Sequence, residues 1–340
     1  MMSTMPPLTP RRVAGSLDEL LAGATDRRPF LTTDSKSGSL FERVLIDGAP
    51  HVVKHVHVDR DWTMRFNGDI GCHPVTVWAL GLMDVCPEHI DHGVVGVAGG
   101  LGRNGWGGVI VMRDLGAELV PPGDDVLAEE HVLDHLDHLA ALSARTLGWR
   151  DELGLLVPLG NRWSWFNPAS LQVEAERGWP DEVPPIAARG WERFAERAPR
   201  DVSAAIDALR RDNGPLVVAA QSTPQSFVHG DWKLGNVGRG ADGRTVLIDW
   251  SYPGEAPPCS ELAWYLSLNR SRLPMTKEAA IDAFAAALER HGAAPSAWFE
   301  RQLRICLLAL LVMMGWEKAL GDEAELGWWC DRARQGLRCL

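Results

Sequence analysis

The spacing of hydrophobic residues changes about one third of the way along the chain, from a period of two to a period of about 3.6. Residues 40–47 and 51–58 alternate as two paired strands do, and residues 48–50 supply a turn between them. Residues 93–97 and 108–112 predict two further strands, joined by a glycine-rich turn. The first third of the chain is therefore predicted to form a small antiparallel sheet.

Helical periodicity dominates from Asp124 onward. The leucines of residues 126–147 form an apolar stripe, preceded by Asp124 and Asp125 as candidate caps and followed by Gly148 as a stop signal. The other predicted helices lie at residues 17–22, 73–84, 185–197, 202–211, 260–270, 277–291, 296–320 and 322–337.

Two short predicted strands, residues 226–228 and 245–248, interrupt the helices. The strand-rich part precedes the helix-rich part, and the change falls near residues 113–116. We therefore predict an α+β fold with two domains, residues 1–113 and 114–340, which suits a prior of roughly 100–200 residues per domain.

Composition narrows the classes of protein. The 34 lysines and arginines against 45 aspartates and glutamates give a net charge of −11, which repels a polyanion and argues against nucleic-acid binding. Six cysteines lie far apart and predict reduced thiols. Residues 1–12 lack the apolar core of a signal peptide, and the apolar run at residues 305–316 is shorter than the roughly 20 residues that span a bilayer. A cytoplasmic protein without a membrane segment is expected.

The candidate chemistry is concentrated in residues 227–250 (FVHGDWKLGNVGRGADGRTVLIDW). Asp231 follows the first short strand, Asn236 comes five positions later, and Asp249 ends the second short strand. In phosphoryl transfer a carboxylate orients the attacking hydroxyl, while an amide and another carboxylate hold the magnesium ion on the phosphates. The three residues have the types and the D-x4-N spacing of such a site.

This stretch resembles the aminoglycoside phosphotransferase and choline kinase family, which carries H-G-D-x4-N followed by I-D-[WF]. Residues 257–264 (PPCSELAW) are similar to the P-x-x-D-L-A element of the family, with Glu261 in place of aspartate. The resemblance implies a two-lobed protein-kinase-like fold with a small antiparallel-sheet lobe and a larger helical lobe. It also implies ATP and Mg²⁺ as cofactors, Asp231 as catalytic base, and Asn236 and Asp249 as metal ligands.

The same family supplies a nucleotide site in the first lobe. Lys54, in the predicted strand at residues 51–58, is the candidate cation for the phosphates. The family pairs this lysine with a glutamate of the next helix, but residues 55–87 contain no glutamate, which leaves Asp69 or Asp84 as candidate partners.

Two backbone segments complete the predicted nucleotide site. The hinge of the family corresponds to residues 110–116, where the backbone near Met112 to Asp114 would pair with an adenine edge. The phosphate-covering loop corresponds to residues 35–39, with Ser37 and Gly38.

A small acceptor is favoured over a protein. Glu261 follows Asp249 by only 12 positions and no A-P-E sequence occurs, so there is no activation segment on which a protein could lie. Residues 118–152 carry nine acidic side chains against two arginines, which suits a cationic acceptor such as an aminoglycoside or amino sugar, or equally the acid preference of helix N-termini. Other sugars, amino alcohols and macrolides are further candidate acceptors. A regulatory pseudokinase is an alternative function, which the missing glutamate favours.

Other motifs have simpler interpretations. Residues 100–105 match G-x-G-x-x-G, but a strand follows where a helix should, which favours a hairpin turn. His131, His135 and His138 share one helical face and have zinc spacing, although a solvated polar face is favoured. His229 is interpreted as a structural histidine. The aromatic residues of the predicted loop at residues 163–166 are candidates to stack on a sugar ring, but tryptophan is also a common core residue, so a core role is the alternative.

Overall fold

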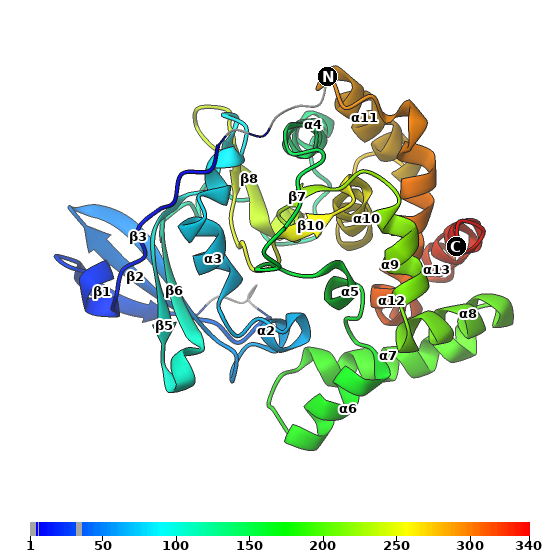
Figure 1. The fold of residues 1–340 in the computed structure, drawn as a ribbon, viewed down its shortest axis with the longest axis horizontal. Coiled ribbons are helices and arrows are strands. Elements are labelled where there is room, and N and C mark those ends of the chain that lie inside the picture. Colours follow the sequence, from blue (N-terminus) through cyan, green and yellow to red (C-terminus); the bar gives the residue numbers. More distant parts are fainter. Residues whose placement is uncertain (1–4, 6, 32–35) are drawn as a thin grey trace.

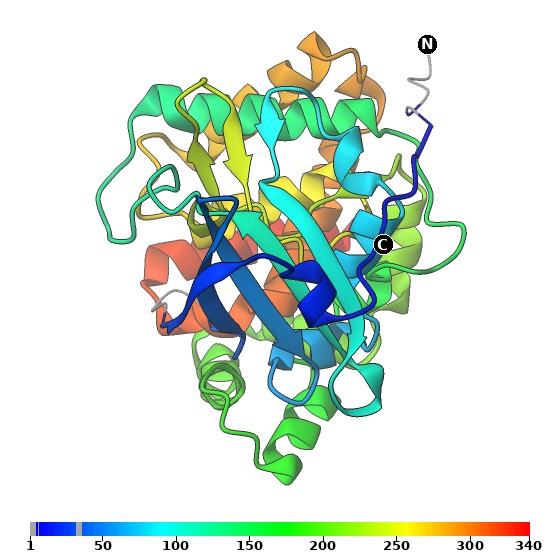
Figure 2. The same cartoon turned by 90° about the vertical axis from the view of Figure 1, so that its left-hand side faces the viewer.

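The computed structural model describes residues 5, 7–31 and 36–340. A sheet occupies one end of the molecule and helices the other (Figure 1). Five strands form an antiparallel sheet in the order β1-β2-β3-β6-β5, seen face on in Figure 2. They are β1 (Thr25–Phe30), β2 (Leu40–Ile46), β3 (Ala49–His57), β5 (Val94–Leu101) and β6 (Gly107–Arg113). Four of them were predicted, whereas β1 is an exposed, polar edge strand without alternation.

The hairpin between β2 and β3 turns at Asp47 and Gly48, whose φ values of 51° and 76° are typical of a two-residue type I′ turn. The predicted turn at residues 48–50 is therefore displaced, because Pro50 lies in β3 opposite Leu45. Pro50 has no N–H to donate, and its carbonyl accepts a hydrogen bond from the Asp114 N–H at 3.0 Å. This contact ties the hairpin to the segment after β6.

Alternation along the strands gives the sheet two different faces. Val53, Val109 and Val111 belong to a small core on one face. Ile110 belongs to the main core, which extends into the helices. Lys54 pairs with Ile110 in the register of β3 and β6, so its side chain lies on the helical face of the sheet. The strand pattern thus directs one cation toward the rest of the molecule.

Short helices follow β3. The first, α2 (Trp62–Asn67), was not predicted and begins at Asp61, whose carboxylate accepts hydrogen bonds from the N–H groups at the start of the helix. The second, α3 (His73–Ala79), is separated from the 3-10 helix η1 (Leu82–Val85) by Gly81. Gly81 has φ of 72°, and a Cβ there would lie 2.2 Å from the Thr9 carbonyl oxygen. The predicted helix at residues 73–84 is therefore broken in two.

Most of the remaining helices were predicted, with shifted ends. These are α4 (Glu129–Arg145), α7 (Val183–Arg197), α8 (Arg200–Arg211), α10 (Pro258–Leu268), α11 (Lys277–Arg290), α12 (Phe299–Leu320) and α13 (Glu323–Leu337). The sequence did not predict α5 (Leu159–Arg162), α6 (Pro168–Arg177) or α9 (Gly214–Gln221). The expected caps of α4, Asp124 and Asp125, are not its caps, because α4 begins after Ala128. Hydrogen bonds from Leu127 N–H to the Arg272 carbonyl and from Arg272 Nε to the Asp125 carbonyl tie the preceding segment to another part of the fold.

Two small sheets bracket the predicted motif. β7 (Ser226–Val228) pairs with β10 (Gly254–Ala256). β8 (Val237–Arg239) and β9 (Thr245–Leu247) form a hairpin, and β9 also pairs in parallel with β4 (Ile90–Asp91). The motif is thus fixed on both sides by strands.

The helix α12 packs against α7, α10 and α13, and sixteen of its 22 residues are buried. Its long apolar run is therefore a core helix, as predicted. Within residues 5, 7–31 and 36–340, no helix has the length and hydropathy needed to cross a lipid bilayer.

Candidate active site

The motif residues leave their strands through backbone conformations that are specific to each position. Gly230, two residues after β7, has φ of 88°, and a Cβ there would lie 1.9 Å from the Tyr252 carbonyl oxygen. Only glycine fits at this position. Asp249, two residues after β9, also adopts positive φ (63°), which is uncommon for a residue with a side chain. Such strained residues often occur at functional sites.

Asp231 is 1% exposed, and its carboxylate accepts hydrogen bonds from three side chains among the described residues. Trp264 Nε1 donates to Oδ1 at 2.7 Å, while Asn236 Nδ2 at 2.7 Å and Lys233 Nζ at 2.8 Å both donate to Oδ2. Burial raises the pKa of Asp231, and the nearby Lys233 ammonium partly opposes this effect. The carboxylate is therefore ionisable, sequestered from bulk water and held in one orientation.

Asn236 and Asp249 each have a side-chain oxygen that accepts no hydrogen bond from the described residues. The Asn236 Nδ2 group donates to both the backbone oxygen (3.0 Å) and Oδ2 of Asp231, which directs its carbonyl oxygen away from them. Asp249 Oδ1 accepts from Lys54 at 2.7 Å and from Ser251 Oγ. Among the described residues, no donor contacts Asp249 Oδ2. Two uncommitted oxygens of this kind fit a hard divalent cation.

Lys54 is the cation of this cluster. It is 6% exposed, and although burial lowers the pKa of its ammonium group, attraction from Asp249, Asp61 and Asp231 outweighs burial and raises it. Asp249 has a strongly lowered pKa, because Lys54 outweighs the opposing effect of burial. The ion pair joins β3 to the end of β9.

The acid beside Lys54 from the next helical segment is Asp61, not Asp69 or Asp84. Asp84 pairs with Arg11, and Asp69 accepts from the His73 N–H at 2.9 Å. Both candidates suggested by the sequence are therefore wrong, because α2 precedes the helix that was predicted at residues 73–84. Asp61 is 2% exposed, and burial raises its pKa while Lys54 lowers it.

The predicted phosphate loop lies beside Asp61. Ser35 is outside the described residues, whereas Ser37 Oγ lies 3.1 Å from Ser39 Oγ, which donates to Asp61 Oδ2 at 3.4 Å. Gly38 has φ of 78°, and a Cβ there would lie 2.0 Å from the Arg60 carbonyl oxygen. The loop is thus held next to the Lys54 cluster, and its glycine permits the close approach.

Two backbone N–H groups of the predicted hinge already donate hydrogen bonds within the protein. The Arg113 N–H donates to the Gly93 carbonyl and the Asp114 N–H to the Pro50 carbonyl, both at 3.0 Å. The Asp114 carboxylate pairs with Arg43 at 3.2 Å. In the described part of the chain, the next N–H with no acceptor is that of Leu115. Met112 lines a narrow apolar cavity together with Ile110, Ile248, Lys54 and Asp249.

His229 and Glu261 hold the motif in place. His229 Nε2 donates to the Ile248 carbonyl at 3.0 Å, and the Asp231 N–H donates to its Nδ1 at 3.2 Å. Burial lowers the pKa of His229 to about 3, so it is neutral, and its predicted structural role is confirmed. Glu261 accepts from the Gly230 N–H at 2.6 Å and the His229 N–H at 3.2 Å. Burial raises the pKa of Glu261 to about 7.

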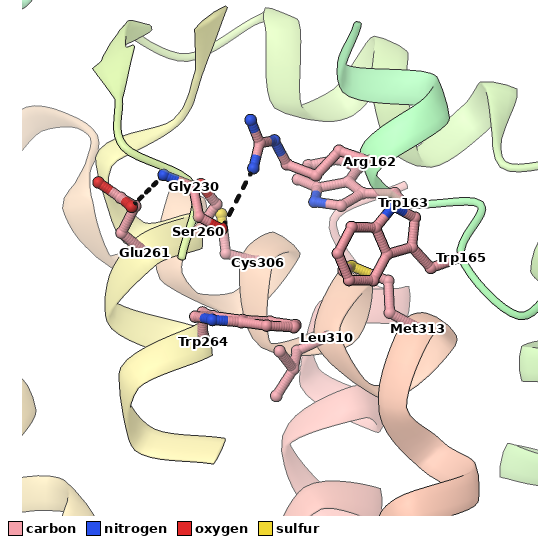
Figure 3. Close-up of a pocket in the computed structure, with 10 residues that line it drawn as sticks. All are labelled: Arg162, Trp163, Trp165, Gly230, Ser260, Glu261, Trp264, Cys306, Leu310 and Met313. Atoms are coloured by element: carbon pink, nitrogen blue, oxygen red, sulfur yellow. Dashed lines mark hydrogen bonds between the residues drawn. The ribbon is translucent and has the colours of Figure 1, made fainter. Parts of the chain in front are cut away.

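A narrow pocket adjoins the motif (Figure 3). Arg162, from α5, donates to the Tyr252 carbonyl and, at 3.5 Å, to the Gly230 carbonyl. Trp163 and Trp165 also line the pocket, but they are 2% and 5% exposed, and Phe166 is 1% exposed. Their burial favours the alternative that these aromatic residues belong to the core. Trp165 and Phe166 pack against Trp62, and Phe166 also packs against Phe66 and Trp316.

The other motifs have structural roles. Residues 100–105 form the turn of the β5–β6 hairpin, as predicted. On α4, His135 is buried rather than solvated, and His138 Nδ1 lies 2.6 Å from Thr245 Oγ1. No group of three or more histidine, cysteine or acidic side chains suited to a metal ion occurs within the described ranges. Of the acids in residues 118–152, Asp134 pairs with Arg239 and Asp137 with Arg290, so part of that charge is neutralised.

The sequence reasoning missed several residues of the site. Lys233 lies within the predicted motif, and its positive charge could have indicated that it contacts Asp231. Asp61 had a weaker signal, an acid placed before a short run with helix-forming residues. Trp264 and Arg162 offered none, because each reaches the motif from a distant helix.

The fold and this cluster of residues define a kinase-like phosphotransferase. The choline kinase LicA from Streptococcus pneumoniae matches with a TM-score of 0.51 and 12% identity over 95% of this chain and 96% of that chain. The aminoglycoside phosphotransferase APH(3'')-Id from Streptomyces rimosus matches with a TM-score of 0.50 and 18% identity over 87% of this chain and 97% of that chain. At these identities the similarity concerns the fold, and it confirms the predicted kinase-like architecture.

The family follows from the sequence itself. A model described as the phosphotransferase enzyme family matches residues 91–298, and the chain belongs to this family. The predicted resemblance is thereby confirmed, and the chain is an enzyme of the small-molecule kinase type. A comparison with curated proteins found no match.

Proposed function

We propose that the chain transfers the terminal phosphoryl group of ATP, bound with Mg²⁺, to a hydroxyl group of a small polar molecule, with aminoglycosides and amino sugars as the first candidates. The supporting observation is that Asp231, Asn236, Asp249 and Lys54 meet in one connected cluster. A base for the hydroxyl, two oxygen ligands and a cation for the phosphates are the parts that this reaction needs.

Each residue has a role in this proposal. Asp231 orients the acceptor hydroxyl and takes its proton, and Lys54 binds the nucleotide phosphates. The loop with Ser37 and Gly38 covers the phosphates. The backbone near Met112 to Asp114 binds the adenine edge, with the Leu115 N–H as the first donor that has no acceptor among the described residues. Residues 1–113 would then form the nucleotide lobe, and residues 114–340 the catalytic and acceptor lobe.

Asn236 and Asp249 would hold the magnesium ion through the oxygens that make no other contact among the described residues. The ion would neutralise negative charge on the phosphates when bound. Asn236 is well suited to this, because its Nδ2 group is already committed to Asp231 and its carbonyl oxygen is left to face a cation.

Two substitutions test these assignments. Asp231→Asn should abolish turnover while MgATP affinity stays within a few-fold, because the base is lost but no nucleotide contact is. Asp249→Ala should instead lose magnesium-dependent nucleotide binding in calorimetry, because it removes an anionic ligand. Asp242→Ala, at an exposed acid that pairs with Arg244, is the matched control. An undiminished rate in D231N, or unchanged magnesium dependence in D249A, would contradict the respective role.

The identity of the acceptor is open to a direct test. The two structural relatives are named for different acceptors, choline and an aminoglycoside, and both names suggest amines that carry hydroxyl groups. Consumption of MgATP should be measured with a panel of aminoglycosides, amino sugars, other sugars, amino alcohols and macrolides. Turnover with one class identifies the acceptor.

A regulatory pseudokinase is the second candidate, and the absence of a glutamate from residues 55–87 favours it. In that case MgATP would bind without being consumed with any acceptor. The presence of Asp231, Asn236 and Asp249 together favours the enzyme. Phosphorylation of any acceptor in the panel, lost in D231N, excludes the pseudokinase.

A further inference from the structure

The two oxygens of Asp231 carry unequal numbers of hydrogen bonds. Oδ2 accepts two, from Asn236 and Lys233, and Oδ1 accepts one, from Trp264. A carboxylate offers about four acceptor sites, two on each oxygen. The site that remains for an acceptor hydroxyl is therefore on Oδ1, the same atom that the indole N–H contacts.

Trp264 is held rigidly at this position. It lies three residues after Glu261 on α10, so both side chains project from one face of that helix. Glu261 binds the backbone of Gly230, and Trp264 binds the side chain of Asp231, so α10 contacts the motif at two points. Its ring packs edge-on against Trp165, with centroids 5.8 Å apart.

The surroundings of the indole leave it little room to move. Trp264 is 8% exposed and lines the narrow pocket of Figure 3 with Leu310 and Met313. That pocket holds only about 20 Å³ of free volume, which is enough for one water molecule. The pocket is therefore the rigid support behind the base rather than a seat for the acceptor.

We propose that Trp264 is a positioning residue for the reaction, which fixes Asp231 Oδ1 in the direction of the acceptor hydroxyl and stabilises the ionised carboxylate. This inference rests on the proposed role of Asp231 as base. An indole N–H is a donor only, so it favours an anionic acceptor and cannot accept a hydrogen bond from a hydroxyl group. The N–H leaves the second acceptor site of Oδ1 available for the proton.

The contact predicts an effect on turnover rather than on nucleotide binding. The indole N–H donates to the proposed base and contacts none of the proposed nucleotide or metal ligands, so its loss should lower kcat and leave the KM for ATP almost unchanged. A merely structural role of the ring would change the stability of the protein and both kinetic constants together.

The test uses the full-length protein and the acceptor found in the panel. Trp264→Phe keeps an aromatic ring and removes the donor. We expect kcat to fall by about 10- to 150-fold, in line with the loss of one hydrogen bond to a charged group. The KM for ATP and the MgATP affinity should change less than two-fold. Trp191→Phe is the control, because Trp191 is also buried and its Nε1 has no partner among the described residues.

A second measurement does not depend on an active W264F protein. With ¹⁵N-labelled indoles, the chain gives up to 15 tryptophan side-chain signals. Asp231→Asn should shift one indole N–H signal strongly, and the same signal should be the one absent in W264F. If W264F is poorly folded, the D231N comparison alone decides.

The outcomes separate this inference from the proposed function. An unchanged kcat in W264F, or the absence of any indole signal that responds to D231N, would overturn the positioning role while D231N remains inactive. Full activity of D231N would instead overturn the proposed base itself.

Discussion

Lys54 Nζ lies 2.7 Å from Asp249 Oδ1, although the two residues are 195 positions apart in the chain. The pair connects β3 of the five-stranded sheet to the end of β9 in the helical part. It also places a cation and an anion next to each other where the proposed nucleotide phosphates and metal ion would meet.

Replacing Lys54 by methionine should therefore weaken nucleotide use more than it weakens the fold. The loss of a charged hydrogen bond to phosphate is worth roughly 1.5–3 kcal/mol, which corresponds to an increase of the KM for ATP by about 10- to 150-fold. Steady-state kinetics with varied ATP would measure it. Lys277→Met removes an ion pair of similar length to Glu325 on a different face and should leave this KM unchanged. Equal effects of both variants would refute the assignment of Lys54.

Asp61 should support Lys54 through its charge, and Asp61→Asn separates that charge from the helix cap. Asparagine is as good an N-cap as aspartate, so α2 should remain intact and the free energy of unfolding should change by less than about 1 kcal/mol. The KM for ATP should nevertheless rise several-fold, because Lys54 loses one attracting carboxylate. Asp84→Asn, at the exposed acid that pairs with Arg11, is the control. If D84N raises the KM as much as D61N does, Asp61 has no special role.

Glu261 should make the free energy of unfolding depend on pH near neutrality. Its pKa is raised to about 7 in the folded protein from an ordinary value of 4.5, so the folded state binds the proton more tightly. The stability that it contributes is present below pH 4.5 and is lost as the pH rises to 7. Glutamine at this position cannot ionise. The stability of E261Q relative to the wild type should therefore increase between pH 5.5 and pH 8, by about 1–3 kcal/mol.

Urea unfolding at the two pH values measures this difference. Glu255→Gln is a suitable control, because Glu255 is partly exposed and pairs with Arg150. A difference between E261Q and the wild type that is the same at pH 5.5 and pH 8 would show that Glu261 is ionised throughout.

The sequence predicted the parts of this molecule that depend on local pattern. Strand alternation located Lys54, and the D-x4-N spacing located Asp231 and Asn236, because neighbours along the chain determine which face a strand residue takes and where a loop begins. The hairpin at residues 100–105 was recognised for the same reason. The proposed roles of the site residues still rest on that pattern and on the geometry around them.

What the sequence could not predict depends on packing between distant segments. Trp264 reaches Asp231 over 33 positions, and its contact follows from how α10 docks on the motif. Trp163 and Trp165 were candidates to stack on a sugar ring, yet both are buried, and Trp165 packs against Trp62 and Trp264. The start of α4 was misplaced because hydrogen bonds to Arg272 extend the segment before it.

His138 should make the protein less stable in mild acid, with a sign opposite to that of Glu261. Its ring lies 4.3 Å from that of His89, and its Nδ1 lies 2.6 Å from Thr245 Oγ1. Burial, together with the neighbouring His89, lowers the pKa of His138 to about 4 from an ordinary value of 6.5, although Asp134 and Asp137 oppose this. The unfolded chain therefore binds the proton first, and stability is lost as the pH falls from 6.5 to 4.

His138→Gln removes this ionisation while keeping a polar side chain near Thr245. The free energy of unfolding of H138Q should fall less than that of the wild type between pH 7 and pH 4.5, by about 1–2 kcal/mol. Urea unfolding at four or five pH values would show it, with His131→Gln as the control on an exposed position of the same helix. Parallel curves for H138Q and the wild type would mean that His138 takes up its proton in the folded protein as readily as in the unfolded chain, and the contact with the His89 ring would then have no part in acid sensitivity.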